Sequence, residues 1–487
     1  MIRSGPMITI HDGDCLVCLG TLALLVTLGV MALAARAAAA SADPCVAFRE
    51  ALTATRKLIQ EAPFRDRDPS GAELFLETNV SAAFNDALAA ADRDRPLLGR
   101  GDHRTNLGLP NPDNVYWLAR IEPGVDYRIV GKRGTSADLT FQLLDGYPGT
   151  GTLGTNAGLL RSKDLAVEPD GSFEIFVGPT PHAGNRLAPI LAGADTLVIR
   201  ETFQDWEKER PGTYRLERVG VEKQDVEPSA TELREALVDA ASILRAQSTV
   251  YVRFVAELLG LKPPDPGTPA SRGLPPNFLS PPVQTKSGLP GQRSSLAHFV
   301  LEEGQVMVVT VAPSRFPYQG FEVGNLWFQT FDWARHQSSL TTAQARRDAD
   351  GLYRFVLSPT DPGVPNWLDT VGQREGFAFL RWQGLDEDLP QEQWPQVEIV
   401  SLAELRERLP GDTPVVTPEE RKRSVAERER AVARRYAETA EPVREIVRRI
   451  GALDRAVAPE CQPSSFLPAF AFRTSTLDED VDPKPPS

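Results

Sequence analysis

The clearest pattern of hydrophobic and polar positions lies between Asn111 and Gly146 and continues to Phe203 as short apolar runs separated by turn residues. Aromatic, aliphatic and Thr residues fill these runs, and such residues fit a half-buried pleated surface. Pro123-Gly124 separates the first two runs and is typical of a type II turn. We therefore expect a β-domain with at least five strands. The predicted strands are Val115 to Ile121, Tyr127 to Gly131, Ala137 to Leu144, Ser172 to Pro179 and Thr196 to Phe203.

The same pattern recurs about 180 residues later. Four landmarks carry the match: Gly124 with Gly304, Asp170 with Asp350, Asn185 with Asn366, and Phe141 of FQLLDG with Phe328 of FQTFDW. The first two pairs are 180 residues apart, the third 181 and the fourth 187. Because the landmarks keep one order along the chain, they predict two homologous β-domains.

The motif NPDNVY, Asn111 to Tyr116, followed by FQLLDGY, resembles the bacterial domain-of-unknown-function family 1254. The second half, with LWFQTFDW and DGLYRFVLSPTDPGVPNWLDT, is similar to family 1214, which usually follows it in one chain. The resemblance covers roughly Asn111 to Val400 and implies jelly-roll-like β-sandwiches without a settled activity. Asn114 stands where the family has Thr, and the linker between the halves is unusually long.

Apolar residues at three- and four-residue spacing predict helices around the β-domains. The predicted helices are Asp43 to Glu61, Ser70 to Ala91, Ser229 to Leu261, a short helix after Ser401 and a long one from Thr417 to about Ile450. Ser70 with Glu73 and Ser229 with Glu232 have the spacing of a capping box. The charged run RKRSVAERERAVARRYAE predicts a solvated helix lying on a sandwich.

These patterns predict a mainly β protein with added helices, of the α+β class, built on two tandem jelly-roll-like β-sandwich domains. The Pro- and Gly-rich linker is expected to be an ordered wrap or a flexible connection. The predicted divisions are a signal peptide or membrane anchor (1–40), a helical N-terminal segment (41–110), the first β-sandwich (111–225), a connecting helix (226–262), the linker (263–295), the second β-sandwich (296–400), C-terminal helices (401–460) and a tail (461–487).

The stretch from Cys15 to Ala35 is an uninterrupted apolar run of 21 residues, long enough to span a bilayer as a helix. Ala38 and Ala40, which follow it, fit a signal-peptidase site. A cleaved signal peptide and a retained anchor both export everything after Ser41. We therefore expect a periplasmic or extracellular protein of the cell envelope, with the membrane as a partner if the segment is uncleaved.

Cys45 and Cys461 are the only cysteines outside the apolar run. An oxidising compartment favours joining them, which would link the first helix to the tail. Two separate buried thiols are the alternative.

The net charge of −13 excludes nucleic acid as an expected partner, because binding phosphates requires a basic surface. GTGTLG, Gly149 to Gly154, matches the dinucleotide fingerprint in letters, but no convincing helix start follows it, so no cofactor is expected. The histidines lack metal-ligand spacing, and no metal site is expected. A metal shared in space by His103 and His298 is the remaining alternative.

Polar residues around the NPDNVY motif are the candidate ligand-binding group: His103, Arg104, Asn111, Asp113, Asn114 and Tyr116. Asp and Asn at a strand entrance usually form turns. If the group shared one mouth of the sandwich, Asp113 and Tyr116 would suit a sugar or another polyol, and Arg104 a carboxylate. Asp145 and Asp332, at the ends of the two FQ runs, would be paired carboxylates if the mouths faced one another, with strand termination as the alternative.

The sequence favours an exported cell-envelope protein that binds or scaffolds a polar ligand such as a glycan. One alternative is a hydrolase or lyase on such a substrate, using Asp113 with His103. Another is a structural assembly module that forms an oligomer. Whether the protein is an enzyme stays open at this stage.

Overall fold

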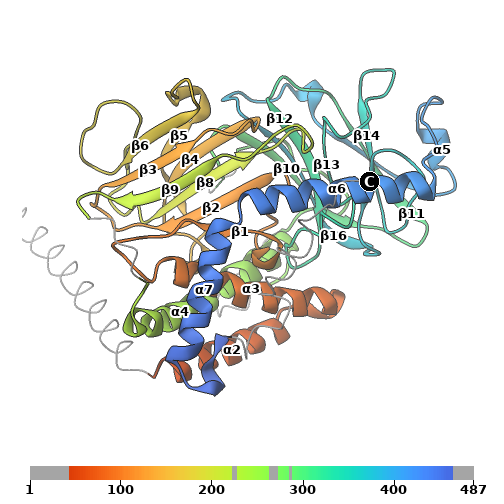
Figure 1. The fold of residues 1–487 in the computed structure, drawn as a ribbon. Helices are drawn as coiled ribbons and strands as arrows, with labels where there is room; N and C mark the ends of the chain where they lie inside the picture. The colour runs from red at the N-terminus through yellow and green to blue at the C-terminus, as the bar shows by residue number, and fades with distance from the viewer. Residues whose placement is uncertain (1–42, 222–226, 263–271, 285–287, 464–487) are drawn as a thin grey trace, which may run out of the picture.

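The computed structural model describes residues 43–221, 227–262, 272–284 and 288–463. Two β-sandwiches lie side by side, and a layer of helices lies against them (Figure 1). The predicted α+β class, mainly β with added helices, is confirmed.

The first sandwich packs a five-stranded sheet, ordered β1-β2-β8-β4-β5, on a four-stranded sheet, ordered β7-β6-β3-β9. Alternation along β2 buries Val115, Trp117 and Ala119 in the core between the sheets and turns Asn114 and Tyr116 to the other face. The strands are β1 (Gly99–Gly101), β2 (Asn114–Arg120), β3 (Tyr127–Lys132), β4 (Asp138–Asp145), β5 (Thr155–Arg161), β6 (Ser172–Val177), β7 (Arg186–Leu187), β8 (Thr196–Thr202) and β9 (Thr213–Arg218).

The second sandwich repeats this topology. Its sheets are ordered β10-β16-β12-β13 and β15-β14-β11-β17. The first order matches β2-β8-β4-β5 and the second matches β7-β6-β3-β9, so each strand corresponds to the strand with a number eight lower. Even the parallel pair of β6 with β7 recurs, as β14 with β15. The predicted duplication is therefore confirmed. The strands are β10 (Gln292–Val300), β11 (Gln305–Val311), β12 (Tyr318–Gly324), β13 (Ser339–Thr341), β14 (Tyr353–Ser358), β15 (Trp367–Asp369), β16 (Glu375–Gln383) and β17 (Gln396–Ser401).

One landmark of the predicted repeat was wrong. The counterpart of β4 is β12, whereas Phe328 follows β12 in a turn and has φ of 58°. Asn325 forms this turn, because its Oδ1 accepts hydrogen bonds from the backbone N–H groups of Trp327 and Gln329, both at 3.0 Å. The letters FQ therefore recur at positions that are not equivalent.

The helices confirm most of the predicted segments. Ser229 and Glu232 form the predicted capping box of α4, whereas α3 is capped by Asp68 instead of Ser70. The predicted single helix from Thr417 is broken near Ala440, because Pro442 has no N–H with which to continue the hydrogen-bond ladder. The helices are α2 (Pro44–Gln60), α3 (Pro69–Ala89), α4 (Ala230–Leu258), α5 (Leu405–Arg408), α6 (Pro418–Glu438) and α7 (Glu441–Ala456).

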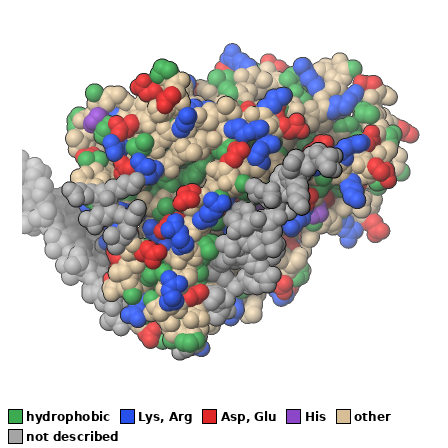
Figure 2. Space-filling view, in the orientation of Figure 1, with side chains coloured by type: hydrophobic (Ala, Val, Ile, Leu, Met, Phe, Trp, Pro, Cys, Tyr) green, Lys and Arg blue, Asp and Glu red, His purple; other side chains and the backbone are tan. Residues whose placement is uncertain are grey.

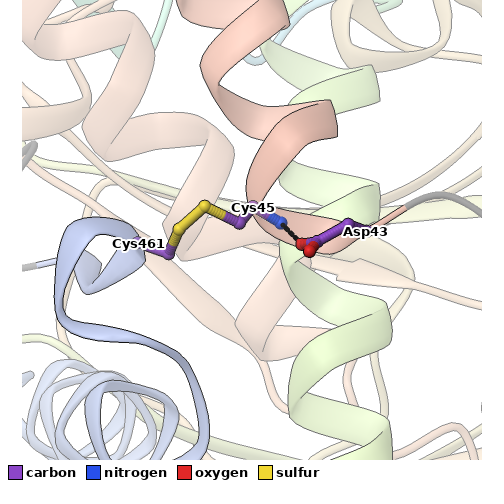
Figure 3. Close-up of a disulfide and its surroundings, with 3 residues drawn as sticks. All are labelled: Asp43, Cys45 and Cys461. Atoms are coloured by element: carbon purple, nitrogen blue, oxygen red, sulfur yellow. Dashed lines mark hydrogen bonds between the residues drawn. A yellow bond between two sulfur atoms is a disulfide. The ribbon is translucent and has the colours of Figure 1, made fainter.

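The N-terminal and C-terminal helices meet in one cluster. Phe48 of α2, Phe84 of α3, Leu237 of α4 and Leu453 of α7 share its apolar core. A disulfide joins Cys45, at the start of α2, to Cys461 beyond α7, with their Cα atoms 5.3 Å apart (Figure 3). The predicted link between the first helix and the tail is confirmed.

Two boundaries differ from the predicted divisions. Strand β1 lies inside the predicted helical segment 41–110, and β10 begins inside the predicted linker. The described linker residues run along β10, with bridges from Pro276 to His298 and from Val283 to Ser294, so this part is an ordered wrap.

No helix within the described ranges is long and apolar enough to cross a membrane. The apolar run from Cys15 to Ala35 lies outside the described residues.

Candidate functional site

Acidic and basic side chains are interspersed on the face of the molecule shown in Figure 2. No field of one sign covers that face, so a charged ligand would be recognised there by a local group of residues.

The NPDNVY motif lies at the junction of the two sandwiches. The Oδ1 of Asn111 accepts a hydrogen bond from the Asp113 N–H at 3.0 Å, which is the turn geometry expected of such residues. Its Nδ2 donates to the hydroxyl of Tyr318 on β12 at 2.9 Å, and that hydroxyl donates to Oδ2 of Asp113 at 2.6 Å. The motif therefore fastens the second sandwich to the first.

Asp113 is buried, with 1% of its surface exposed. Trp206 Nε1 donates to its other oxygen at 2.8 Å, so both carboxylate oxygens have partners inside the protein. Burial raises the pKa of Asp113, and the hydrogen bond from Tyr318 opposes that rise. In this geometry Asp113 links the two sandwiches through its hydrogen bonds, and its carboxylate is not exposed to a ligand.

Tyr116 differs from Asp113 because its side chain keeps partial contact with solvent. Its hydroxyl accepts hydrogen bonds from the Asn111 backbone N–H at 3.2 Å and from Asn114 Nδ2 at 3.0 Å. Within the described residues, no acceptor takes the hydroxyl proton of Tyr116. The Tyr116 hydroxyl is therefore fixed by two hydrogen bonds that it accepts, and its proton can be donated to a ligand.

The register of the sheet places three more polar side chains beside Tyr116. Tyr116 on β2 is opposite Arg200 on β8, and Arg200 is opposite Thr140 on β4. Residues opposite one another on neighbouring strands share one face of the sheet. Asn114 lies on this face as well, since it is two residues from Tyr116. We name Asn114, Tyr116, Thr140 and Arg200 the Tyr116 patch.

Arg200 has an unusual electrostatic environment. Burial lowers its pKa, and Tyr116 is the titratable neighbour that acts against this effect. Its guanidinium carbon lies 5.9 Å from the centre of the Tyr116 ring, and its Nη1 donates to Oε1 of Gln142. No carboxylate forms an ion pair with Arg200 in the part of the chain that the structure describes. This positive charge is therefore largely enclosed by protein without a counter-charge.

The second sandwich closes one side of the patch. Gln383, at the end of β16, donates through Nε2 to Oδ2 of Asp138 at 2.8 Å and to the Thr202 hydroxyl at 2.9 Å. Arg381 on the same strand pairs with Glu322 and donates to the Leu109 carbonyl at 2.8 Å. Arg381 is thus neutralised within the junction, in contrast to Arg200.

Three polar atoms around the patch are shielded from solvent and have no hydrogen-bond partner in the described structure: Asn114 Oδ1, Thr140 Oγ1 and Gln383 Oε1. A buried polar atom without a partner costs about 1–3 kcal/mol. Buried polar atoms in native proteins usually have a partner, so these three atoms call for an explanation.

His103 and Arg104 lie elsewhere, on the short 3₁₀-helix η2 (His103–Thr105). Arg104 forms an ion pair with Asp102, and the His103 ring stacks on Tyr436 with the ring centres 6.1 Å apart. Neither side chain contacts Asn111, Asp113, Asn114 or Tyr116 in the described structure. The six predicted residues therefore form two groups, because η2 packs on α3 and places the His103 ring against Tyr436 of α6.

Asp145 and Asp332 are not brought together. Asp145 ends β4, seven residues from Asp138, which is a separation of about 24 Å at 3.4 Å per residue. Asp332 follows the turn at Phe328 and caps the next turn, where its Oδ1 accepts from the Ala334 N–H at 3.0 Å. His103 and Arg428 are among the groups that interact electrostatically with Asp332. His103 follows β1 at the end of the sheet where Asn114, Thr202 and Asp138 lie in one row, so Asp332 is near the Asp138 end.

Sequence reasoning missed Arg200, Trp206 and Tyr318. Arg200 carried a usable signal, since this basic residue directly follows the apolar run Leu197 to Ile199 in the strand TLVIRET. Trp206 and Tyr318 carried no local signal because they reach Asp113 from segments 93 and 205 residues away along the chain.

The fold is similar to that of an uncharacterised protein from Burkholderia cenocepacia, with a TM-score of 0.62 and 26% identity, over 73% of this chain and 96% of that one. A protein from Vibrio parahaemolyticus aligns with 68% of this chain and 99% of its own at 11% identity, with a TM-score of 0.37. No family model matches the chain, and no curated protein matches it. The similarity to the Burkholderia protein supports the fold but gives no information about ligand or activity.

Proposed function

We propose that this protein is an exported protein of the cell envelope that binds a polar, hydroxyl-rich ligand such as a glycan at the Tyr116 patch. The observation that carries the proposal is the Tyr116 hydroxyl, which two amide N–H groups hold in place while its own proton has no acceptor among the described residues. Export is supported by the apolar run before Ser41 and by the disulfide, since disulfides persist in oxidising compartments.

The patch offers chemistry that matches a sugar hydroxyl, which both donates and accepts hydrogen bonds. Tyr116 and Arg200 are donors that keep partial access to solvent, and the Tyr116 hydroxyl oxygen can also accept a hydrogen bond. A few fixed polar groups of this kind are what orients a ligand in a binding site.

The alternative of a hydrolase or lyase that uses Asp113 with His103 has less support from the geometry. Asp113 is enclosed between Trp206 and Tyr318, and His103 packs on Tyr436 at the other group. A different set of catalytic residues would be needed for that hypothesis.

The test is binding by the purified protein, measured by thermal unfolding and calorimetry against neutral glycans, organic acids, lipids and divalent metals. A ligand that binds only the folded state raises the unfolding midpoint. Tyr116→Phe is expected to weaken the binding of a hit about tenfold, because one hydrogen bond contributes about 1 kcal/mol or more.

Tyr353→Phe is the matched control, because Tyr353 is a buried strand tyrosine of the second sandwich whose hydroxyl has no hydrogen bond in the described structure. It should leave binding unchanged. The proposal fails if no compound of the panel binds, or if Tyr116→Phe binds every hit as tightly as the parent does.

A further inference from the structure

Most buried arginines outside the patch have a carboxylate partner in this structure. These buried arginines pair as Arg100 with Asp102, Arg293 with the exposed Asp388, Arg381 with Glu322, Arg421 with Asp361 and Arg449 with Glu445. This agrees with the rule that enclosed charges are paired, because an unpaired charge away from water is costly. Arg200 is half-buried and has no carboxylate partner among the described residues.

Two further buried arginines have no ion pair within the described residues, but the protein satisfies them in other ways. Arg428 donates to the backbone carbonyls of Trp333 and Ser339. The guanidinium of Arg435 lies 4.5 Å from the ring centre of Trp206 and 5.1 Å from that of Phe203, and its terminal nitrogens are closed to solvent. Aromatic faces of this kind attract a cation. Neither arginine is placed to meet a ligand.

Arg200 combines a charge that has no carboxylate partner in the described structure with a side chain that is partly accessible to solvent. Its one hydrogen bond in the described structure goes to the neutral amide of Gln142, and its side chain keeps partial contact with solvent beside Tyr116. A guanidinium presents a planar fork of donors that matches the two oxygens of a carboxylate. The Tyr116 hydroxyl, on the adjacent strand, is placed to donate to the same group or to a neighbouring hydroxyl.

We propose that the ligand of the Tyr116 patch is a carboxylated polyol, such as an acidic sugar, whose carboxylate is bound by Arg200. This inference rests on the proposed function and adds the charge of the ligand. A single negative charge balances the single unpaired cation. Asp138 lies on the same face of the sheet, opposite Thr202 and two residues along β4 from Thr140, which is opposite Arg200. Its negative charge would repel a phosphate dianion more strongly than a carboxylate, so a phosphate fits less well.

The experiment compares acidic compounds with their neutral counterparts by calorimetry on the full protein: galacturonate with galactose, and gluconate with sorbitol. The parent is expected to bind at least one acid about tenfold or more tightly than its neutral partner, since a hydrogen bond between two charged groups is roughly twice as strong as one between neutral groups. Arg200→Gln is expected to remove this preference, because Gln keeps polarity without the charge. Arg200→Lys is expected to recover only part of it, since an ammonium lacks the planar fork.

Arg128→Gln is the matched control, because Arg128 is also a strand arginine but is paired with Glu174 and Glu217 on the other sheet of the same sandwich. It should keep the full preference for the acid. Thermal unfolding of each variant shows whether it is folded.

The outcomes separate the two proposals. If the parent binds the acid and the neutral sugar equally and Tyr116→Phe weakens both, the proposed function holds and the inference about charge is wrong. If the preference persists in Arg200→Gln, the carboxylate is bound elsewhere and the inference is also wrong. If neither acids nor neutral compounds bind, both proposals fail.

Discussion

At the scale of single residues, the junction between the sandwiches depends on hydrogen bonds that cross it. The Tyr318 hydroxyl of the second sandwich lies between Asn111 and Asp113 of the first, and all three side chains are buried. Because water cannot replace a lost partner there, each bond should contribute more than a surface hydrogen bond would.

Tyr318→Phe is therefore expected to lower the free energy of unfolding by about 1–3 kcal/mol, because it leaves a buried oxygen of Asp113 without a donor. Denaturant unfolding measures this change. Tyr353→Phe, which removes a hydroxyl without a partner in the described structure, should change stability by less than about 0.5 kcal/mol. Equal effects of the two variants would contradict a special role for the bond to Asp113.

Glu201 gives a prediction about pH. Its side chain is fully buried, and burial raises its pKa to about 7, although the Gly212 N–H and the Ser136 hydroxyl donate to it and oppose the rise. A carboxyl group with a raised pKa in the folded state stabilises the protein below its unfolded pKa of 4.5. That contribution is lost as the pH rises through about 7.

The parent should thus lose stability relative to Glu201→Gln between pH 4.5 and 7.5, by up to about 3 kcal/mol at about 1.4 kcal/mol per pKa unit. Denaturant unfolding of both proteins across this range measures the difference. Parallel curves would show that Glu201 does not titrate in the window.

At the scale of elements, helix α6 connects the two sandwiches through one row of arginines. Arg421, Arg428 and Arg435 are seven residues apart, so two helical turns separate each from the next and all three face the sheets. Arg421 pairs with Asp361 of the second sandwich, whereas Arg435 lies against Phe203 of the first. Burial lowers the pKa of Arg428 to about 10.

Arg428→Met is expected to lower the free energy of unfolding by about 2–4 kcal/mol, because it leaves the carbonyls of Trp333 and Ser339 without donors. Arg430→Met is the control on the same helix, since Arg430 is exposed. It should change stability by no more than about 0.5 kcal/mol. Similar losses for the two variants would show that α6 is held by its apolar residues instead.

The contrast between strands and α6 explains what the sequence could predict. Strand β2 can be predicted because apolar residues alternate along it, and β8 because it carries the apolar run Leu197 to Ile199. The duplication follows from turn residues such as Gly124 and Gly304. The prediction that α6 is a solvated helix lying on a sandwich is confirmed for most of its length, but the burial of Arg421, Arg428 and Arg435 was missed. Their partners are a carboxylate, carbonyls and aromatic rings from distant segments, which leave no local pattern in the sequence.

The same reason limits the prediction of the site. Asn111, Asp113, Asn114 and Tyr116 do meet, as their closeness in sequence implied, but His103 and Arg104 point to a different group. Whether a neighbouring residue joins a cluster depends on the direction of the intervening turn. A single sequence does not encode that direction in any local pattern.

At the scale of the whole molecule, the disulfide closes a loop that contains both sandwiches. Cys45 and Cys461 are separated by 416 residues. A cross-link stabilises a protein mainly because it restricts the unfolded chain, and this restriction grows with the length of the loop.

Replacing both cysteines with Ala is expected to lower the free energy of unfolding by about 2–5 kcal/mol. Denaturant unfolding without reductant measures this loss. Either single replacement should have a similar effect because it breaks the same bond, and reductant should destabilise the parent but not the double variant. A parent that is insensitive to reductant would show that the bond does not form in solution.

The joining of the two ends also sets an order of events during synthesis. Helix α2 is made before either sandwich, yet the α7 residues Ile446, Ile450 and Leu453 that complete its cluster, and the cysteine that fixes it, are made after both. Each sandwich draws its strands from one continuous stretch, although Ala431 and Val432 of α6 complete the core of the first sandwich later. The helical cluster must wait for α7, so a chain released before Glu441 would carry the strands of both sandwiches beside an incomplete set of helices.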